Sequence, residues 1–336
     1  MFNKILIEKG LQDNPYAKNI LKHFKKTPLS EIDDYTDFFG PIKKPYLQKR
    51  DNLNLFLASK KGALLKEAPD AYGLSGEPHY YYVHAYNCIY ECSYCYLQGY
   101  FNSPDLVLFV NHDEILKSIE EKIIEHSKVS DTGIWFHAGE FSDSLALSHI
   151  TGELSKYFEL FKKYPNAYLE FRTKSANIRE LIKQQALPNV ITSFSLSPEQ
   201  RVLDHDYKTP PLKARLRAIS KVVEKSHPIG IHLDPIIYTE DLIESYGQLL
   251  DELNRVIPLD KIEYISVGVV RFTKDVYNQV KMNYPESEYF HSELIRGHDG
   301  KIKYPRPMRH WILNQVRHLC LERGAREESV YLCMED

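Results

Sequence analysis

The chain has 336 residues, 43% of them hydrophobic and 26% charged, and its formal net charge is −3. This length suits one large α/β domain with appendages, or two domains. The charge excludes a protein that is cationic over its whole surface, so any contact with nucleic-acid phosphates must be local.

The N-terminus and the cysteine count indicate the compartment. The segment Met1–Lys9 has only a short apolar run before a charge, and no later apolar run approaches the length of a membrane span. Five cysteines, an odd number, favour reduced thiols in a chain without a signal peptide. We therefore expect a cytoplasmic protein that does not bind membranes and whose clustered cysteines bind metal.

Residues 1–77 are expected to form an N-terminal extension that packs on the main domain. They show a short helical pattern near Pro15–Lys25 and turn-rich, basic pieces such as Pro41–Pro45, without a periodic core of their own. No chemistry is visible in this part of the chain.

Cys88, Cys92 and Cys95 follow an expected strand at 79–84 and have C-x3-C-x2-C spacing. Three thiolates can hold three irons of a cubane [4Fe–4S] cluster and leave the fourth iron without a protein ligand. A structural zinc normally has four protein ligands. The loop therefore predicts a cluster with one iron open to a substrate.

Two other interpretations of this loop are a zinc knuckle completed by His84 or His79, and a disulfide in an exported protein. An aromatic residue, Tyr94, stands directly before the last cysteine. With it, the loop resembles the cluster loop of the radical S-adenosylmethionine (SAM) enzymes. In that superfamily the open iron chelates the amino and carboxylate groups of SAM, and an electron from the cluster cleaves SAM to a 5′-deoxyadenosyl radical.

From about residue 78 to 270, apolar runs of strand length alternate with helical patterns. Such units predict a parallel sheet with crossover helices. Because the length is short for a complete eight-fold barrel, we expect a partial (β/α)6-type TIM barrel, the radical SAM core. Strands are expected at 79–84, 105–111, 134–137, 168–172, 190–195, 229–233 and 262–269, and helices at 113–127, 144–163, 177–184, 211–225 and 240–255.

Residues 271–336 are expected to form a C-terminal region of a different kind. Leu294–Tyr304 predicts a β-hairpin whose turn is His298–Gly300, since Asp-Gly supplies positive φ at low cost. Around it we expect a helix that ends near Met282, a helix at 308–323 and a final strand at 330–333. Region 296–326 carries eight Lys or Arg against two Asp or Glu, a local charge of +6, which fits either a phosphate-binding patch or a solvated basic face.

Polar residues follow the expected barrel strands, and ligands of an α/β barrel bind at the carboxyl ends of its strands. We expect these residues to converge with the cysteine loop on one mouth, although Ser142 or Asp143 could instead cap the following helix. The segments are His137–Asp143, Thr173–Lys174, Ser195–Ser197 and His232–Asp234.

At these positions the chain resembles a narrower family, the spore photoproduct lyases. These radical SAM enzymes reverse the thymine dimer 5-thyminyl-5,6-dihydrothymine in DNA. The resemblance covers roughly 78–305 and is clearest at Cys92–Gln98, Phe194–Ser197, Arg271–Lys274 and Tyr284–Pro285.

The resemblance implies roles for residues outside the cysteine loop as well. Ser142, Lys174 and Ser195 fall on positions that contact SAM, and Asp234 is expected to join them. Tyr94 and Tyr96 match tyrosines that relay a hydrogen atom, and both are candidate catalytic residues. The hairpin resembles the one that enters damaged DNA as the dimer is flipped out, and its predicted DNA contacts are Arg296, Lys301, Lys303 and Tyr304.

Glu140 departs from the family pattern. Spore photoproduct lyases carry a cysteine at the aligned position, which returns a hydrogen atom to the product radical. Ala138–Glu140 instead resembles the Gly-Gly-Glu element of many other radical SAM enzymes, whose glutamate accepts from the SAM amino group. Glu140 is thus a candidate catalytic or SAM-binding residue, or a charge at a helix start. Cys333, on the terminal strand, could fold back toward the site, whereas Cys320 has no assigned role.

The sequence therefore predicts a radical SAM carbon–carbon lyase that repairs a thymine-dimer lesion. Its cofactors are a [4Fe–4S] cluster and SAM, and its partners are damaged DNA and a reducing protein such as flavodoxin or ferredoxin. We expect a monomer. The alternatives are a radical SAM enzyme of the same family with another nucleic-acid or small-molecule substrate, and a non-catalytic iron–sulfur or zinc DNA-binding module.

Overall fold

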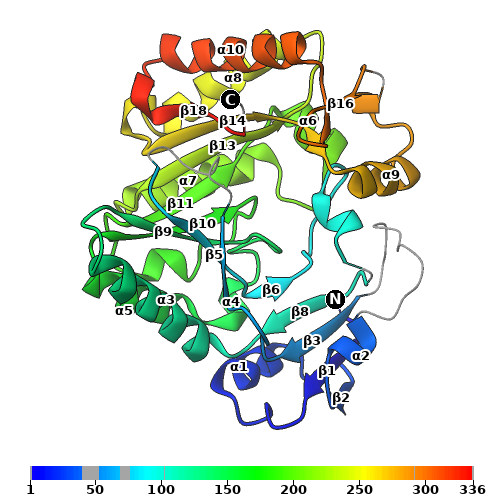
Figure 1. Ribbon diagram of the computed structural model, residues 1–336, viewed down its shortest axis with the longest axis vertical. Coiled ribbons are helices and arrows are strands. Elements are labelled where there is room, and N and C mark those ends of the chain that lie inside the picture. The colour runs from blue at the N-terminus through cyan, green and yellow to red at the C-terminus, as the bar shows by residue number, and fades with distance from the viewer. Residues whose placement is uncertain (1, 40–52, 69–75, 102, 291, 335–336) are drawn as a thin grey trace.

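The computed structural model describes residues 2–39, 53–68, 76–101, 103–290 and 292–334 (Figure 1). In these ranges the chain forms two larger sheets, of eight and five strands, with helices packed on them. No helix in these ranges is long and apolar enough to cross a membrane. The architecture is mixed α/β, as predicted.

The eight-stranded sheet is the partial barrel. Its strand order is β18-β14-β13-β11-β10-β9-β5-β4, and every neighbouring pair is parallel except β4 with β5. The outermost strands, β4 and β18, are not paired with each other, so the barrel stays open. The strands are β4 (Leu65–Glu67), β5 (His79–Tyr82), β9 (Ile134–Ala138), β10 (Ala167–Thr173), β11 (Val190–Ser195), β13 (Ile229–Ile236), β14 (Tyr264–Val269) and β18 (Val330–Leu332).

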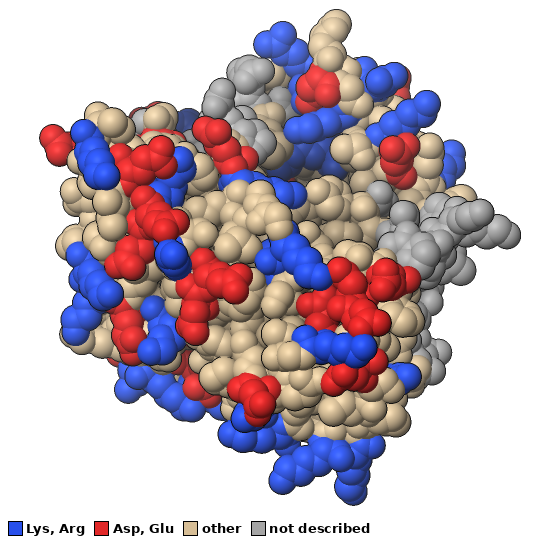
Figure 2. Space-filling model, turned by 60° about the horizontal axis from the view of Figure 1, so that its bottom comes forward, with Lys and Arg blue, Asp and Glu red and all other residues tan. Residues whose placement is uncertain are grey.

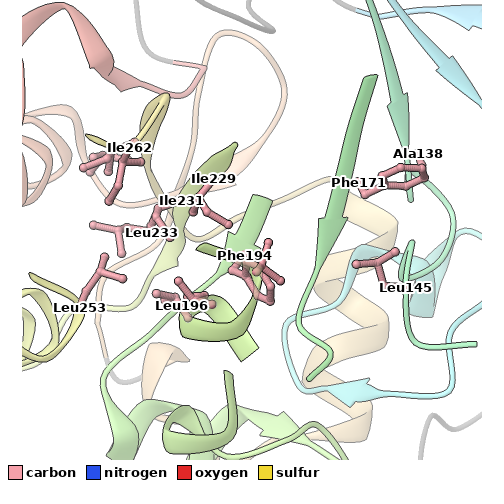
Figure 3. Packing of buried hydrophobic residues seen from close by; sticks show 14 of the residues in the cluster. Ala138, Leu145, Phe171, Phe194, Leu196, Ile229, Ile231, Leu233, Leu253 and Ile262 are labelled. Carbon is pink, nitrogen blue, oxygen red and sulfur yellow. The ribbon is translucent and has the colours of Figure 1, made fainter. Parts of the chain in front are cut away.

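Amphipathic helices cover the outer face of this sheet (Figure 1). Outward-pointing side chains of the strands pack under them, and Figure 3 shows Ile231 and Leu233 of β13 in the same layer as Leu253 of α8. All three are fully buried. The covering helices are α3 (His112–Ser127), α5 (Leu154–Lys163), α7 (Leu212–Glu224), α8 (Leu242–Val256) and α10 (Arg306–Glu322).

Two predicted helices differ from the structure. The helix expected at 144–163 is two helices, α4 (Ser148–Thr151) and α5, separated at Gly152, whose φ of 77° ends α4. The helix expected at 177–184 is only a 3-10 turn, Leu181–Lys183. The side-chain amide group of Asn177 donates to the carbonyl group of Leu145 at 2.8 Å, which ties residues 177–184 to the loop that contains Leu145.

The five-stranded sheet lies at the N-terminal end of the molecule (Figure 1) and has the order β2-β1-β3-β8-β6. The apolar run Leu106–Val110 forms a strand here and not in the barrel, because β8 pairs with β3. The strands are β1 (Lys4–Glu8), β2 (Leu29–Ile32), β3 (Asn54–Ala58), β6 (Ala85–Tyr86) and β8 (Leu106–Phe109).

The N-terminal helix was predicted and is confirmed as α1 (Pro15–His23). Asn14 caps it, since its side chain accepts from the amides of Tyr16 and Ala17. This part of the chain shares a core with the strands that follow it, since Ile20 packs with residues of β1, β3 and β8. The domain limits at 77/78 and 270/271 stay a prediction, but β6 and β8 belong to the N-terminal sheet.

The C-terminal region contains the predicted hairpin. β16 (Ile295–Arg296) and β17 (Ile302–Lys303) are antiparallel, and Gly300 in their turn has a φ of 76°. β17 also pairs with β15 (Arg271–Phe272), which precedes α9 (Lys274–Asn283).

Candidate functional site

The three-cysteine loop starts at the end of β6. Asn87 adopts a φ of 62°, and its side-chain amide group donates to the backbone carbonyl groups of Ser103 and Asp105, both at 2.7 Å. These bonds hold the loop against the strand that leaves it. Within the loop, the amide of Cys95 donates to the carbonyl group of Cys92 at 3.0 Å. A local turn therefore brings these two cysteines together.

The thiols of this loop are buried or half-buried and lie within electrostatic reach of one another. Burial raises the pKa of Cys88 to about 12, with smaller contributions from Asp143 and Cys95. Burial likewise holds the pKa of Cys92 well above its usual range. Such thiols bind a metal only as thiolates, so the metal displaces their protons when it binds.

Three soft sulfur donors on one loop fit an iron–sulfur cluster with three protein ligands. Among the described residues, no group of three His, Cys, Asp or Glu side chains converges on one point, as a single ion needs. His79, one candidate fourth zinc ligand, is bonded through Nδ1 to His137 Nε2 at 2.8 Å.

Tyr94 is held in a buried ionic network behind the loop. Its hydroxyl group contacts Asp206 and the Lys174 ammonium group, which lies 3.1 Å from the Asp206 carboxylate. The buried Arg215 guanidinium group donates to the other oxygen of Asp206 at 2.9 Å. Burial would raise the pKa of Asp206, but Lys174 and Arg215 outweigh it and lower the pKa to about 2.

Glu140 follows β9 at the mouth of the barrel. Gly139 turns the chain there with a φ of 92°, and a Cβ at this position would meet Ser144 Oγ at 2.5 Å. The hydroxyl group of Tyr96, which is 38% exposed, hydrogen-bonds to the Glu140 carboxylate. Burial raises the pKa of Glu140, and Arg172 opposes this shift. Glu140 and Tyr96 are therefore partners.

Asp143 fastens two strand-end loops together. Its carboxylate accepts from the amides of Leu145, Ala146 and Lys174 and from the Thr173 hydroxyl group, at 2.7 to 3.0 Å. Asp143 does not cap the following helix, because α4 begins only at Ser148 with Leu147 at its N-cap; its carboxylate binds the amides of a loop instead.

The remaining predicted SAM contacts lie within barrel strands or in the loop that follows one. Ser142 lines a small cavity with Cys88, and Ser195 is the buried last residue of β11. Asp234 accepts from both Arg271 amino groups at 3.1 Å and lies 3.6 Å from Arg172. Burial would raise the pKa of Asp234, but the two arginines lower it to about 2.

The barrel interior below the mouth holds a polar network that the sequence reasoning missed. Glu170 accepts from His137 Nδ1 at 2.5 Å, from His232 Nε2 at 2.7 Å and from the Tyr264 hydroxyl group at 2.5 Å; Ser193 also contacts it. Burial would raise the pKa of Glu170, but the bonds from the two histidines hold it well below its usual range. Polar residues at alternate positions of β9, β10, β11 and β13 were the signal for it.

Only part of the predicted DNA-contact set is accessible. Arg296 is exposed and Lys301 is half-buried. Lys303 is buried and paired with Asp299 at 3.1 Å. Tyr304 is fully buried, and its hydroxyl group accepts from the Tyr238 amide at 3.1 Å. The predicted DNA contact of Tyr304 is therefore wrong for this conformation.

The basic region 296–326 is largely engaged within the protein. Arg317 pairs with Glu327 at 2.9 Å, and Arg323 pairs with Asp251 at 2.7 Å. Figure 2, which turns the N-terminal sheet toward the viewer, shows basic and acidic side chains interspersed on that face as well. The local charge of +6 thus overstates the free positive charge.

Cys333 does fold back toward the mouth. Its amide donates to the Val267 carbonyl group at 2.8 Å, and an Arg271 amino group lies 3.5 Å from its sulfur. Cys320 is buried on α10 within the main core.

Comparison with known proteins gives consistent matches. The family model described as spore photoproduct lyase matches residues 75–308. The chain is 28% identical to spore photoproduct lyase of Bacillus subtilis (strain 168) over 207 residues, 61% of this chain and 60% of that protein, which is less than two thirds of its length. It is 24% identical to spore photoproduct lyase of Clostridium acetobutylicum over 295 residues, 86% and 84% of the two chains.

A solved structure is similar over nearly all of both chains. It is a spore photoproduct lyase mutant with bound AdoMet and dinucleoside spore photoproduct. The TM-score is 0.82 at 19% identity, covering 100% of this chain and 99% of the other. This likeness shows the fold.

Proposed function

Because the chain belongs to the spore photoproduct lyase family, we propose that it is a radical SAM lyase that repairs a thymine-dimer lesion of the spore photoproduct type in DNA. One observation carries the proposal: the family match spans residues 75–308, which hold the cysteine loop, the mouth of the barrel and the hairpin together. The dinucleoside lesion and AdoMet bound to a relative of the same fold support it.

In this proposal Cys88, Cys92 and Cys95 hold a [4Fe–4S] cluster, which supplies the electron that cleaves SAM to a 5′-deoxyadenosyl radical. Glu140 binds the SAM ammonium group, since a half-buried carboxylate forms a charge-assisted bond with such a cation. Ser142, Lys174, Ser195 and Asp234 remain proposed SAM contacts. Lys174 and Asp234 must exchange an existing ion pair to make them.

Arg296 and Lys301 are the proposed phosphate contacts of the hairpin. The dimer must leave the base stack, because a radical carbon abstracts hydrogen only at contact distance. A reducing protein of the flavodoxin or ferredoxin class is proposed as the electron donor.

The return of the hydrogen atom needs a group other than the cysteine that relatives carry. Tyr96 is our candidate, because it is partly exposed and its hydroxyl group is bonded to Glu140. Tyr94 is less suited to return the hydrogen atom, because its hydroxyl group is already bonded to Asp206 and Lys174.

The test is an anaerobic assay with reduced protein, SAM and synthetic spore-photoproduct dinucleotide. We expect formation of 5′-deoxyadenosine together with release of thymidylyl-thymidine. Tyr96→Phe should lower dinucleotide repair about tenfold or more while 5′-deoxyadenosine still forms. If the unsubstituted protein cleaved SAM but repaired no dinucleotide, spore photoproduct would not be its substrate.

A second candidate is a radical SAM enzyme of this family with another substrate, which the glutamate at position 140 favours. Glu140→Cys separates the two readings. In a repair enzyme this thiol should raise the yield of repaired dinucleotide per 5′-deoxyadenosine, whereas an enzyme for another substrate should not gain repair. The third candidate, a non-catalytic metal module, requires a metal content that does not respond to SAM.

A further inference from the structure

An exposed tryptophan stands at the mouth end of α10. Trp311 is 44% exposed, whereas Trp135, the other tryptophan of the chain, is stacked on Tyr168 with the ring centres 4.7 Å apart. α10 leads into β18, which is parallel to β14, so α10 runs back along the sheet and its first turns lie at the carboxyl ends of the barrel strands. The reaction proposed above uses no residue of this helix.

A tyrosine from another loop lies against this tryptophan. Tyr238 follows β13 and is half-buried, and its ring meets that of Trp311 at 69°, with the centres 6.2 Å apart. Tyr304, which follows the hairpin, holds both elements: its hydroxyl group accepts from the Tyr238 amide at 3.1 Å, and its carbonyl group accepts from Arg309 of α10 at 2.8 Å. The two rings therefore form a corner that is fixed relative to the hairpin.

A cation lies beside this aromatic corner. Arg306, the first residue of α10, is exposed, and its Nε donates to His310 Nε2 at 3.3 Å. Among the residues that the structure describes, no carboxylate pairs with it. α10 begins three residues after the end of β17, and Figure 1 shows β16 near one end of α10. Arg306 thus extends the basic surface that Arg296 and Lys301 begin on the hairpin.

We propose that the corner of Trp311 and Tyr238 binds an unpaired base of the DNA strand beside the lesion, and that Arg306 binds an adjacent phosphate. Proteins that bind single strands combine aromatic stacking surfaces with positive charge along the backbone. Extrusion of the dimer leaves bases of the duplex without partners, so such a base is present. Glu240 and Asp241, which follow Tyr238, are exposed and repel phosphates, so the strand's backbone would run along Arg306. The inference rests on the proposed function for the identity of the DNA, but binding needs neither SAM nor the cluster.

The first test measures binding of a short, labelled, undamaged oligothymidylate to the full-length protein by fluorescence anisotropy, with SAM omitted. We expect Trp311→Ala to weaken binding about tenfold, because it removes the stacking of one base. Phe38→Ala is the matched control and should bind normally, since Phe38 is a 50% exposed aromatic on α2 (Thr36–Phe39), in the N-terminal part of the chain. Undetectable binding by the unsubstituted protein, or equal affinity in Trp311→Ala, would overturn the proposal.

Tryptophan fluorescence reports the contact itself, because a stacked base quenches indole emission. The oligothymidylate should quench the unsubstituted protein and quench Trp311→Phe much less, since the remaining Trp135 is stacked on Tyr168 in the barrel. Trp311→Phe should still bind more tightly than Trp311→Ala, because phenylalanine keeps a stacking face. Full quenching in Trp311→Phe would place the base elsewhere and refute the site. Quenching by a flavodoxin but not by the oligonucleotide would assign the surface to a protein partner and overturn the proposal as well.

Arg306→Ala tests the phosphate contact. Binding should weaken, and the slope of log affinity against log salt concentration should become shallower by about one, because one phosphate contact releases about one counterion. Arg255→Ala is the matched control and should keep the slope, since Arg255 is exposed in the last turn of α8, which follows β13 and so ends away from the mouth. An unchanged slope in Arg306→Ala would refute this contact.

The outcomes separate this inference from the proposed function. A protein that repaired the dinucleotide but bound oligothymidylate independently of Trp311 would overturn this inference alone. A protein that bound oligothymidylate through Trp311 but repaired no lesion would overturn the proposed function alone, and the corner would remain a single-strand binding site.

Discussion

At the scale of single residues, Asp206 is the carboxylate on which the network behind the cysteine loop depends. It neutralises Arg215, whose side chain is fully buried, and also pairs with Lys174. We expect Asp206→Asn to lower the free energy of unfolding by about 3 kcal/mol or more, because it leaves a buried guanidinium group without a counter-charge. Urea unfolding followed by circular dichroism measures the change.

The control lies two residues earlier in the chain. Asp204 is more exposed and pairs with Arg201 at 3.5 Å, so Asp204→Asn should change the free energy of unfolding by less than about 1 kcal/mol. A similar loss in both variants would contradict the importance given to the buried pair.

Local spacing explains which site residues could be predicted. Cys88, Cys92 and Cys95 stand in one loop, so their pattern is visible along the chain. The partners of Asp206 were not visible, because Lys174 lies 32 residues and Tyr94 112 residues away in sequence. Contacts across the fold decide whether a residue at a strand end is open to a ligand.

At the scale of elements, Gly152 separates α4 from α5. Its φ of 77° lies in the left-handed region, and a Cβ there would meet Asn19 Nδ2 at 2.9 Å. That amide donates to the Ile150 carbonyl group at 2.8 Å. We expect Gly152→Ala to lower the free energy of unfolding by about 2 kcal/mol, from backbone strain and the displaced amide. Thermal unfolding should show a fall in Tm of several degrees.

Gly62 provides a matched control for backbone strain alone. Its φ is 71°, but no atom lies within 4 Å of the position a Cβ would take. Gly62→Ala should therefore cost only about 1 kcal/mol. Equal costs for both variants would show that the contact with Asn19 contributes nothing.

The same glycine explains a limit of prediction for elements. Apolar residues at helical spacing continue through 145–158, so periodicity indicated one helix, and a single glycine does not end such a pattern by itself. Likewise, the run Leu106–Val110 correctly indicated a strand, yet nothing in it indicated pairing with β3 instead of a barrel strand. Strand identity is local, whereas sheet membership depends on the whole topology.

At the scale of the whole molecule, buried neutral histidines make stability depend on pH. Burial lowers the pKa of His79 and His205 to about 4 and that of His112 to about 3. In the unfolded chain they protonate near pH 6.5, so the folded state loses stability as pH falls from about 6.5 to about 4. Each histidine contributes a slope of at most about 1.4 kcal/mol per pH unit. Urea unfolding at several pH values in this window should show the loss.

One substitution separates this effect from surface titration. His112→Gln should make the free energy of unfolding depend less steeply on pH, because unfolding then takes up as much as one proton fewer. His318→Gln, at a side chain that is 66% exposed, is the surface control for this substitution. An unchanged slope in His112→Gln would contradict the role given to this histidine.

The cysteine loop connects β6 to β8, two strands of the N-terminal sheet, which makes the N-terminal residues part of the site's support. β6 ends at Tyr86, two residues before Cys88, and pairs only with β8 in the described sheet, while β8 pairs with β3. We expect a chain of residues 78–336 to lose cooperative unfolding, because β8 would have an open edge and its buried apolar side chains would face water. Supplying residues 1–77 as a separate chain should restore a native near-UV circular dichroism spectrum. If residues 78–336 alone gave that spectrum, the limit at 77/78 would be a true domain boundary and the N-terminal strands would be dispensable for the loop.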